Sequence, residues 1–188
     1  MEHILDTLEG RFSYPMFVKP SGTGSSVGVS KAADRGALAD ALVDAAKFDE
    51  KVLVEEFIRG REVEVAVMGN ANPVASVCGE IDSGADFYDY DAKYVTDTST
   101  AYIPARIPEE VQEQIRKEAV KVYKAIGCRG LSRVDFFATY AENRVVFNEI
   151  NTLPGFTSIS MYPKLFAASG VSYSQLIDNL LALAQEAF

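Results

Sequence analysis

The sequence is poor in positive charge, and this deficit narrows the partners that it can bind. Its 188 residues contain 18 lysines and arginines against 27 aspartates and glutamates, which gives a formal net charge of −9. Nucleic-acid-binding proteins normally carry a basic surface, so the balance argues against a nucleic-acid partner. An acidic protein that handles a polyphosphate must gather its few cations at the site, and a lysine beside a glycine-rich loop is therefore a candidate ligand.

Cysteines and long apolar runs are also scarce. Cys78 and Cys128 lie far apart and fit no metal-binding or redox spacing, so two free thiols in a reducing compartment are expected. No apolar stretch approaches the ~18–20 residues of a membrane span. Met1-Glu2-His3 does not begin a signal peptide. We therefore expect a cytoplasmic protein that has no membrane partner.

Strand-like and helix-like patterns are mixed along the chain. Alternating or continuous apolar residues predict strands at 16–19, 52–57, 62–68, 74–78, 131–137 and 144–150. Helical spacing predicts a helix capped by Asp34, a second that opens at Pro108 and ends at Gly127, and a last one capped by Ser174. Because short turns join several strands into antiparallel pairs, the predicted fold class is α+β.

Two strands carry the strongest chemical signal. Alternation along a strand places Arg133 with Asp135 on one face, and Glu149 with Asn151 on one face. A hairpin centred on Glu142 would pair Asp135 with Glu149 and Arg133 with Asn151, with Cβ atoms ~4.5–5.5 Å apart in each pair. Two carboxylates at this distance repel each other unless one is protonated or a cation lies between them.

The acidic pair has two interpretations that the pairing alone does not separate. Oxygen donors from Asp, Glu and Asn suit Mg²⁺, which takes few protein ligands and completes its shell with water and phosphate oxygens. Alternatively, the acidic side chains form an exposed face and simply point to water. A register shift of one residue would also move one strand's set to the other face.

Two loops offer further candidates. Residues 20–28 form a loop rich in glycine and serine directly after Lys19, and such a loop lets backbone N–H groups approach phosphate oxygens. It is not a P-loop, because the lysine precedes the glycines, and the alternative is a flexible connection. The aromatic and charged residues 87–94 form either a surface loop or a lid that brings Lys93 to a phosphate.

Together these segments resemble the signature blocks of the D-alanine–D-alanine ligase family, in order and in spacing, from about Tyr14 to the C-terminus. The blocks are residues 17–20 with 24–28, 88–94, 132–135 and 148–157. The resemblance implies an ATP-grasp fold, with the remainder of a small lobe at residues 1–58, a larger catalytic lobe at 59–188, and nucleotide between them. It also implies that ATP phosphorylates the carboxylate of one D-alanine and that the amine of a second attacks the acyl phosphate, in peptidoglycan synthesis for the cell wall and cell shape.

The resemblance implies roles for particular residues in binding ATP and metal. Lys19 and Lys93 would contact the phosphates. Glu62 would hold the ribose hydroxyls, or it is a solvated strand residue. The hinge edge that meets adenine would be formed by Glu55, Glu56 and Phe57. Mg²⁺ or Mn²⁺, as two ions, would be bound by Asp135, Glu149 and Asn151.

Other roles concern the reaction and its acceptor. Arg133 and the backbone N–H of Gly155 would stabilise the oxyanion of the tetrahedral intermediate. Ser160 would bind the carboxylate of the second substrate, or it caps a helix that begins near Met161. Ser25 and Tyr94 would join the glycine loop to the lid through hydrogen bonds. Tyr94 matches the tyrosine typical of D-alanine–D-alanine ligases, where lactate-using relatives carry other residues. Met161 lies where D-serine-using relatives resemble each other in carrying arginine.

One departure from the family pattern is large. Family members carry roughly a hundred or more residues before this point, more than half a typical domain, and these include a second phosphate-binding lysine and the part that binds the first D-alanine. We therefore expect the missing N-terminal domain to be a partner, and a homodimer for the full-length protein. The alternatives are a ligase that joins D-alanine to D-lactate or D-serine, and a nucleotide-binding module without enzymatic activity.

Overall fold

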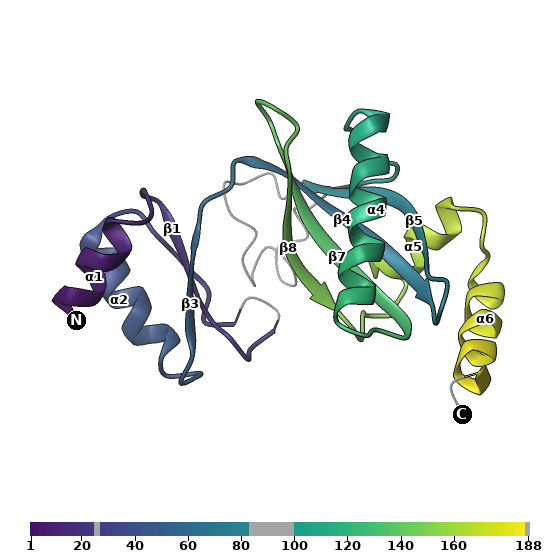
Figure 1. The fold of residues 1–188 in the computed structure, drawn as a ribbon, viewed down its shortest axis with the longest axis horizontal. Helices are drawn as coiled ribbons and strands as arrows, with labels where there is room; N and C mark the ends of the chain where they lie inside the picture. The colour runs from purple at the N-terminus through teal and green to yellow at the C-terminus, as the bar shows by residue number, and fades with distance from the viewer. Residues whose placement is uncertain (25–26, 83–99, 187–188) are drawn as a thin grey trace. The chain divides into compact units, whose positions relative to one another are not determined.

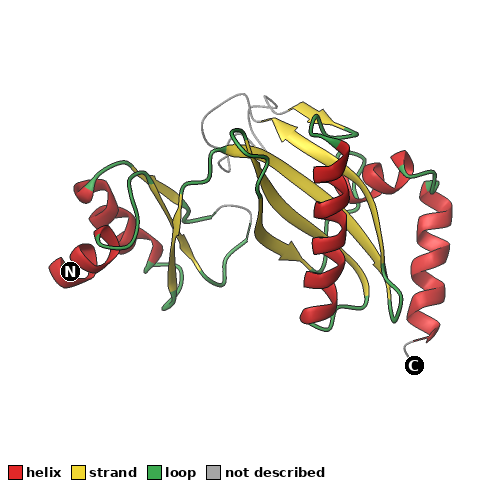
Figure 2. Ribbon diagram, turned by 45° about the horizontal axis from the view of Figure 1, so that its top comes forward, coloured by secondary structure: helices red, strands yellow, loops and turns green. Residues whose placement is uncertain are grey.

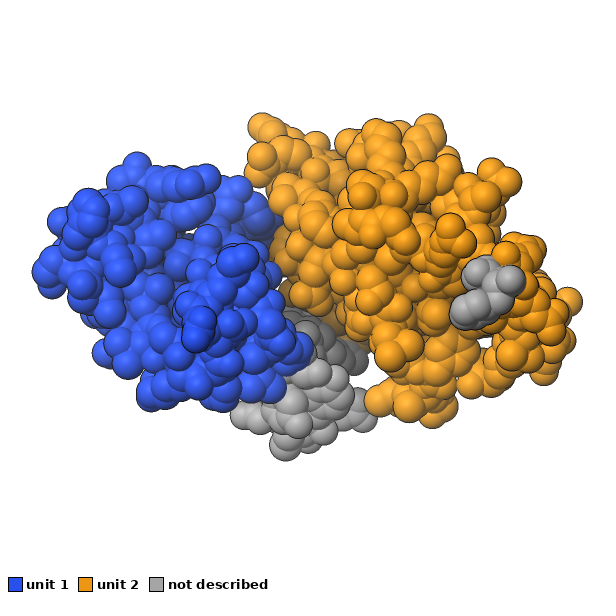
Figure 3. All heavy atoms as spheres, turned by 60° about the horizontal axis from the view of Figure 1, so that its bottom comes forward, with its two compact units in different colours: residues 1–58, 83–99 blue, residues 59–82, 100–188 orange. Residues whose placement is uncertain are grey.

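The structure is a computed structural model that describes residues 1–24, 27–82 and 100–186 (Figure 1). It divides into two compact units. Met1–Ile58 form the described part of one unit, and Arg59–Asp82 with Thr100–Phe188 form the other (Figure 3). Within the described residues, no helix combines the length and the apolar character needed to cross a bilayer.

The first unit places two helices against one face of a small sheet. Its strands lie in the order β2-β1-β3, with β1 antiparallel to both neighbours. In β1, Met16 and Val18 are fully buried and pack with Leu38 of α2, whereas Phe17 and Lys19 alternate to the opposite face. The elements are α1 (Glu2–Glu9), β1 (Met16–Pro20), β2 (Ser30–Ala32), α2 (Arg35–Ala45) and β3 (Val52–Glu56).

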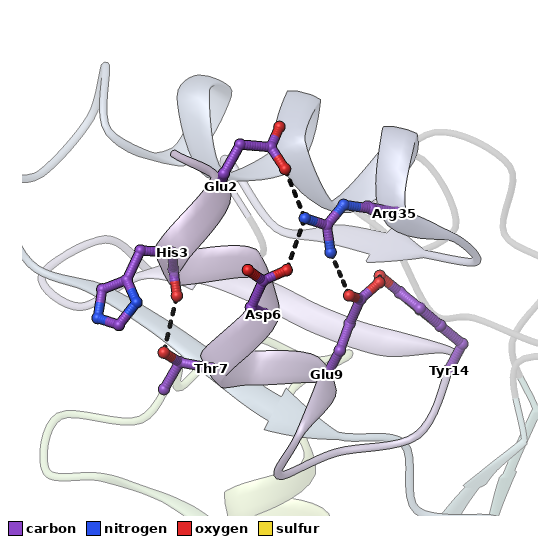
Figure 4. A network of polar contacts seen from close by, with 7 residues as sticks. All are labelled: Glu2, His3, Asp6, Thr7, Glu9, Tyr14 and Arg35. Carbon is purple, nitrogen blue, oxygen red and sulfur yellow. Dashed lines mark hydrogen bonds and ion pairs between the residues drawn. The ribbon is translucent and has the colours of Figure 1, made fainter.

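Charged contacts join the two helices of this unit (Figure 4). Arg35, the first residue of α2, donates to Glu2 at 2.6 Å and to Asp6 at 2.8 Å, and it also pairs with Glu9 of the same helix α1. Tyr14 donates its hydroxyl hydrogen to Glu9 at 2.8 Å. One guanidinium therefore meets three carboxylates that lie at spacings of four and three along α1, the spacings that share one helical face.

The second unit is a five-stranded antiparallel sheet in the order β6-β5-β4-β7-β8, with helices on both faces (Figure 2). Its longest strands, β4 and β7, lie side by side at the centre and pair along their whole length. The elements are β4 (Gly60–Gly69), β5 (Val74–Asp82), β6 (Thr100–Tyr102), α4 (Glu109–Ala125), β7 (Gly130–Thr139), β8 (Val145–Asn151), α5 (Met161–Ala168) and α6 (Tyr173–Glu186).

Two separate apolar clusters cover the faces of this sheet. On one face, the valines of β4 pack with Ile115 and Tyr123 of α4. On the other face, Ala66 and Met68 of β4 pack with α5 and α6. Tyr123 donates to the carbonyl of Gly69 at 2.7 Å, and Tyr162 of α5 donates to the carbonyl of Val67 at 3.2 Å, so a tyrosine from each face anchors β4. The same face of β4 and β7 also carries the charged side chains of Glu64, Arg133 and Asp135.

A charged network also lies within this unit. Glu80 of β5 is 2% exposed. It accepts from the Arg106 side chain at 2.7 and 3.1 Å and from the Arg106 backbone at 2.9 Å, and Arg61 lies 3.2 Å away. Burial raises the pKa of Glu80, but the hydrogen bonds and charge of Arg106 outweigh this effect and lower it. The network ties the segment before α4 to the sheet.

The predicted elements largely agree with the structure. The α+β class and all six predicted strands are confirmed, and Asp34 caps α2 by accepting from the Ala37 backbone at 2.9 Å. Gly127 follows α4 with a φ of +70°, as a left-handed C-terminal residue requires. The predicted cap Ser174 is wrong. Ser172 precedes α6 instead and exchanges hydrogen bonds with Gln175.

Candidate active site

The second sheet face carries a row of three carboxylates beside the part that packs against α5 and α6. Glu64 of β4 lies directly opposite Asp135 of β7, and Asp135 lies directly opposite Glu149 of β8. Arg133 lies opposite Asn151 in the next row. Side chains of directly paired residues share a face. The predicted pairing of Asp135 with Glu149 and of Arg133 with Asn151 is therefore confirmed.

The hairpin that makes this pairing is less regular than predicted. Beyond Asp135 the register shifts by one, so that Phe136 pairs with Phe147 and Asn148 is an extra residue in β8. A bulge of this kind leaves one residue unpaired and bends its strand. The predicted centre at Glu142 therefore holds for the site itself, but it is wrong for the half of the hairpin that lies nearer the turn.

Arg133 is held between two of the three carboxylates. Its Nε and Nη2 atoms donate to the two oxygens of Asp135 at 2.8 and 2.7 Å, and Nε lies 3.3 Å from Oε2 of Glu64. The side chains of Arg133, Asp135 and Glu64 are 21%, 13% and 16% exposed. Burial lowers the pKa of Arg133, but the hydrogen bonds that it donates to Asp135 and the charges of Glu64, Asp135 and Glu149 raise it overall, so the guanidinium stays charged.

The donor set of Asp135, Glu149 and Asn151 fits a hard divalent cation. All three offer oxygen, and Glu149 is exposed. Glu64, Asp135 and Glu149 outnumber Arg133 by two charges, which a divalent cation would neutralise. The Asn151 side-chain oxygen already accepts from the Leu153 backbone at 3.0 Å and keeps a second lone pair.

That set contains two carboxylates and one amide. Within the described ranges, no three or more His, Cys, Asp or Glu side chains are arranged to hold a metal ion. Asp135 must in addition share its oxygens with Arg133. The metal-binding role of these residues therefore stays a prediction.

The segment after β8 brings Gly155 and Ser160 together. A Cβ atom on Gly155 would lie 2.8 Å from the Ser160 hydroxyl oxygen, so only glycine fits there without a shift. Ser160 occupies the residue before α5, but its side chain makes no capping hydrogen bond to that helix. Its oxygen instead accepts from the Thr157 backbone at 3.0 Å and lies 2.9 Å from the Thr157 hydroxyl. The alternative prediction that Ser160 caps this helix is thus confirmed for its position. It is wrong for the side chain, which makes no hydrogen bond to the helix.

Met161 is a core residue in this structure. It is 8% exposed and belongs to the cluster between the sheet and helices α5 and α6. Gly79 of β5 forms the floor beneath it, because a Cβ there would lie 2.5 Å from the Met161 methyl carbon and 2.7 Å from Leu165. The backbone of Met161 adjoins Ser160, whereas its side chain points into the protein. Direct contact of this side chain with a substrate stays a prediction.

In the first unit, the candidates Lys19, Glu55 and Phe57 lie on the sheet face that the helices leave open. The candidate Glu56 lies on the other face, because it is paired directly with the buried Met16. Lys19 forms an ion pair of 2.8 Å with Glu55, at side-chain exposures of 21% and 40%. The centres of the Phe57 and Phe17 rings lie 5.9 Å apart, and the Lys31 ammonium lies 4.6 Å from the centre of the Phe57 ring. Glu56 is exposed. Lysines and aromatic rings on one surface can bind a ligand that is both aromatic and anionic.

The glycine-rich loop is tied down at its base. Asp49 accepts from the Gly22 backbone at 2.5 Å, and the Ser21 backbone donates to the Lys51 carbonyl at 2.8 Å. Gly28 has a φ of +75° and leaves no room for a Cβ between Phe48 and Pro20. The amide of Gly22 is therefore already paired, which narrows the backbone donors that this loop can offer a phosphate.

The comparison with known proteins decides the family. The model of the family described as D-ala D-ala ligase C-terminus matches residues 1–182. The chain belongs to this family. The predicted membership is thereby confirmed.

Relatives and solved structures agree with this family. D-alanine–D-alanine ligases of Acetivibrio thermocellus and Ruminiclostridium cellulolyticum are 58% and 57% identical over 188 and 190 residues, covering 100% of this chain and 50% of each relative. The VanG D-Ala:D-Ser ligase structure from Enterococcus faecalis has a TM-score of 0.87 at 42% identity, over 97% of this chain and 53% of that one. The D-alanine-D-alanine ligase structure from Coxiella burnetii has a TM-score of 0.83 at 38% identity, over 97% and 48%.

These matches establish the ATP-grasp fold and the extent of the chain within it. The chain spans about half the length of the curated relatives it matches. The family is that of the C-terminal part of D-ala D-ala ligases.

The sequence patterns did not identify two charged residues that share a sheet face with predicted site residues. Lys31 lies opposite Phe17 on the same face as Lys19, and both lysines flank the glycine-rich loop. Glu64 lies two residues beyond Glu62 on the same face of β4. Strand alternation could have found both. Ser25, Lys93 and Tyr94, three of the predicted site residues, lie outside the described residues.

Proposed function

We propose that this chain is the ATP-binding and catalytic C-terminal part of an enzyme that joins two D-alanines. The reaction uses ATP and proceeds through an acyl phosphate, and it supplies a precursor of peptidoglycan for the cell wall and cell shape. The observation that carries the proposal is Arg133 on one sheet face with Asp135, Glu149 and Asn151. The relatives named D-alanine–D-alanine ligase support the substrate. We also propose a cytoplasmic location, and a homodimer when the protein is full length.

In this proposal the second unit provides the reaction chemistry. Asp135, Glu149 and Asn151 hold Mg²⁺ or Mn²⁺, as two ions, which supply positive charge to the phosphates when bound. Arg133 and the Gly155 backbone N–H stabilise the oxyanion of the tetrahedral intermediate. Ser160 binds the acceptor carboxylate next to Met161.

ATP binding draws on both parts of the chain. Lys19 and Lys93 bind the phosphates, and Glu62 binds the ribose hydroxyls. Adenine meets the edge formed by Glu55, Glu56 and Phe57. Lys19 is paired with Glu55 at 2.8 Å, so a phosphate must compete with this carboxylate or share the lysine with it. The ammonium has three hydrogens, and sharing is therefore possible. Ser25 and Tyr94 complete the link between the glycine loop and the lid.

For the acceptor substrate, one observation favours an alternative to D-alanine. The likeness to a D-Ala:D-Ser ligase structure, with a TM-score of 0.87, favours D-serine as a second candidate acceptor. Tyr94 favours D-alanine over D-lactate, because lactate-using relatives carry other residues at that position. Met161 favours D-alanine over D-serine, because D-serine-using relatives resemble each other in carrying arginine there. We therefore propose D-alanine as the acceptor.

A competition experiment tests this function. The chain is extended to full length with the N-terminal half that its relatives carry, and it is given ATP, Mg²⁺, D-alanine, D-serine and D-lactate near neutral pH. Mass spectrometry of the products should show mainly D-alanyl-D-alanine. A mixed dipeptide or depsipeptide as the main product would refute the acceptor. ATP binding by a folded protein that releases no phosphate with any acceptor would favour a non-enzymatic module.

A further inference from the structure

Arg133 and Asp135 are hydrogen-bonded to each other in this structure, and this pairing conflicts with their proposed roles. Both oxygens of Asp135 accept hydrogen bonds from Arg133, at 2.8 and 2.7 Å. The proposed function needs the same oxygens for a divalent cation and the same guanidinium for an oxyanion. A cation at Asp135 would also repel the guanidinium. Arg133 therefore needs a second anchor when the cation is bound.

Glu64 stands where that anchor is required. Its Oε2 atom lies 3.3 Å from Nε of Arg133, and its side chain is 16% exposed. Asp135 is the middle member of the carboxylate row, with Glu64 on the β4 side and Glu149 on the β8 side. The two neighbours of Asp135 thus lie on opposite sides of it. A cation held towards β8 would leave the β4 side to the arginine.

We propose that Glu64 is a positioning residue that retains the Arg133 guanidinium when Asp135 turns to the divalent cation. This inference rests on the proposed function and names a residue to which that function gives no role. Glu64 and Arg133 form a pair with no net charge. Asp135 and Glu149 then carry two negative charges, which match one divalent ion.

Glu64→Gln is the variant that tests the proposal, since it keeps the shape of the side chain and removes its charge. Glu142→Gln is the matched control, because it makes the same chemical change in the exposed turn between β7 and β8. The Nε–Hε signal of Arg133 is recorded by ¹⁵N NMR on the 188-residue chain, with and without Mg²⁺. Backbone spectra of each variant report whether it is folded.

The wild type and Glu142→Gln should keep a slowly exchanging Arg133 Hε signal when Mg²⁺ is added. In Glu64→Gln this signal should be lost on adding Mg²⁺, because the guanidinium has no second carboxylate to hold it. Glu64→Asp, which keeps the charge, should show an intermediate response and covers the case in which Glu64→Gln does not fold. In the full-length enzyme, Glu64→Gln should lower kcat by roughly 10- to 100-fold with little change in KM for ATP.

Different outcomes separate the failure of this inference from the failure of the proposed function. If the wild-type Asp135 and Glu149 carboxyl signals respond to Mg²⁺ but Glu64→Gln retains its Arg133 signal and its kcat, the role of Glu64 is refuted and the metal site stands. If the wild-type carboxyl signals do not respond to Mg²⁺, the metal site is refuted and the inference with it.

Discussion

Replacing Glu149 with glutamine should make the metal-free protein more stable. Glu149 lies opposite Asp135 at the end of the carboxylate row, and the neighbouring Glu64, Asp135 and Arg133 together carry one net negative charge. Glu149 is exposed, so the repulsion acts largely through water. At a carboxylate separation of ~6 Å and a dielectric constant near 80, it amounts to about 0.7 kcal/mol. Glu149→Gln should therefore raise the free energy of unfolding by about that amount, or the melting temperature by about 2 °C.

The assay is thermal unfolding at low ionic strength, where screening is weakest, with and without Mg²⁺. Glu142→Gln removes the same charge from the exposed hairpin turn and should leave the melting temperature unchanged. Adding Mg²⁺ should stabilise the wild type more than Glu149→Gln, because the variant loses a proposed ligand. The reasoning is refuted if Glu149→Gln is less stable than the wild type without metal, or if both respond equally to Mg²⁺.

Three further predictions concern other parts of the molecule. Glu80→Ala should lower the free energy of unfolding by about 1.5–3 kcal/mol, because Arg61 and Arg106 lose their buried partner. Urea unfolding measures this, and a loss no larger than that of an exposed carboxylate would contradict it. The folded state lowers the pKa of Glu80, so its contribution to stability should be complete above its ordinary pKa of 4.5 and decline as pH falls through the folded-state pKa. Melting curves from pH 7 to 3 should show this decline in the wild type and a smaller one in a Glu80→Gln variant; equal declines would contradict it. The 188-residue chain alone should unfold cooperatively, with a melting temperature that ATP and Mg²⁺ raise by a small amount, and by less in Glu149→Gln. It should release no phosphate with D-alanine, because it lacks the half that would hold the first D-alanine and fixing both reactants is worth ~7–11 kcal/mol; synthesis of D-alanyl-D-alanine by this chain would show otherwise.

The strand pairing at the site could be predicted because it depends on local sequence. Arg133 and Asp135 are two residues apart, as are Glu149 and Asn151, and a short hairpin joins the two strands. Alternation and turn length together define such a register. The extra residue Asn148 could not be predicted, because a bulge absorbs one residue without disturbing the apolar pattern on either side.

The partners of the charged side chains could not be predicted for a different reason. Arg133 meets Glu64 only because β7 pairs with β4, a strand far away in the sequence. Lys19 likewise meets Glu55 through the pairing of β1 with β3. Local patterns indicate that such residues share a face, but the choice of partner follows from the order of strands in the sheet.

The glycine beneath Met161 restricts which residues can replace this methionine. Gly79 has no side chain, and the Met161 methyl carbon and Leu165 fill the space that one would take. An arginine at position 161 could not follow the path of the methionine, because its charge would enter an apolar cluster without a partner. It would have to leave the core and abandon the space above the glycine. A lineage that acquired arginine at residue 161 alone would therefore pass through a destabilised intermediate, and a second mutation that refills the void would restore stability.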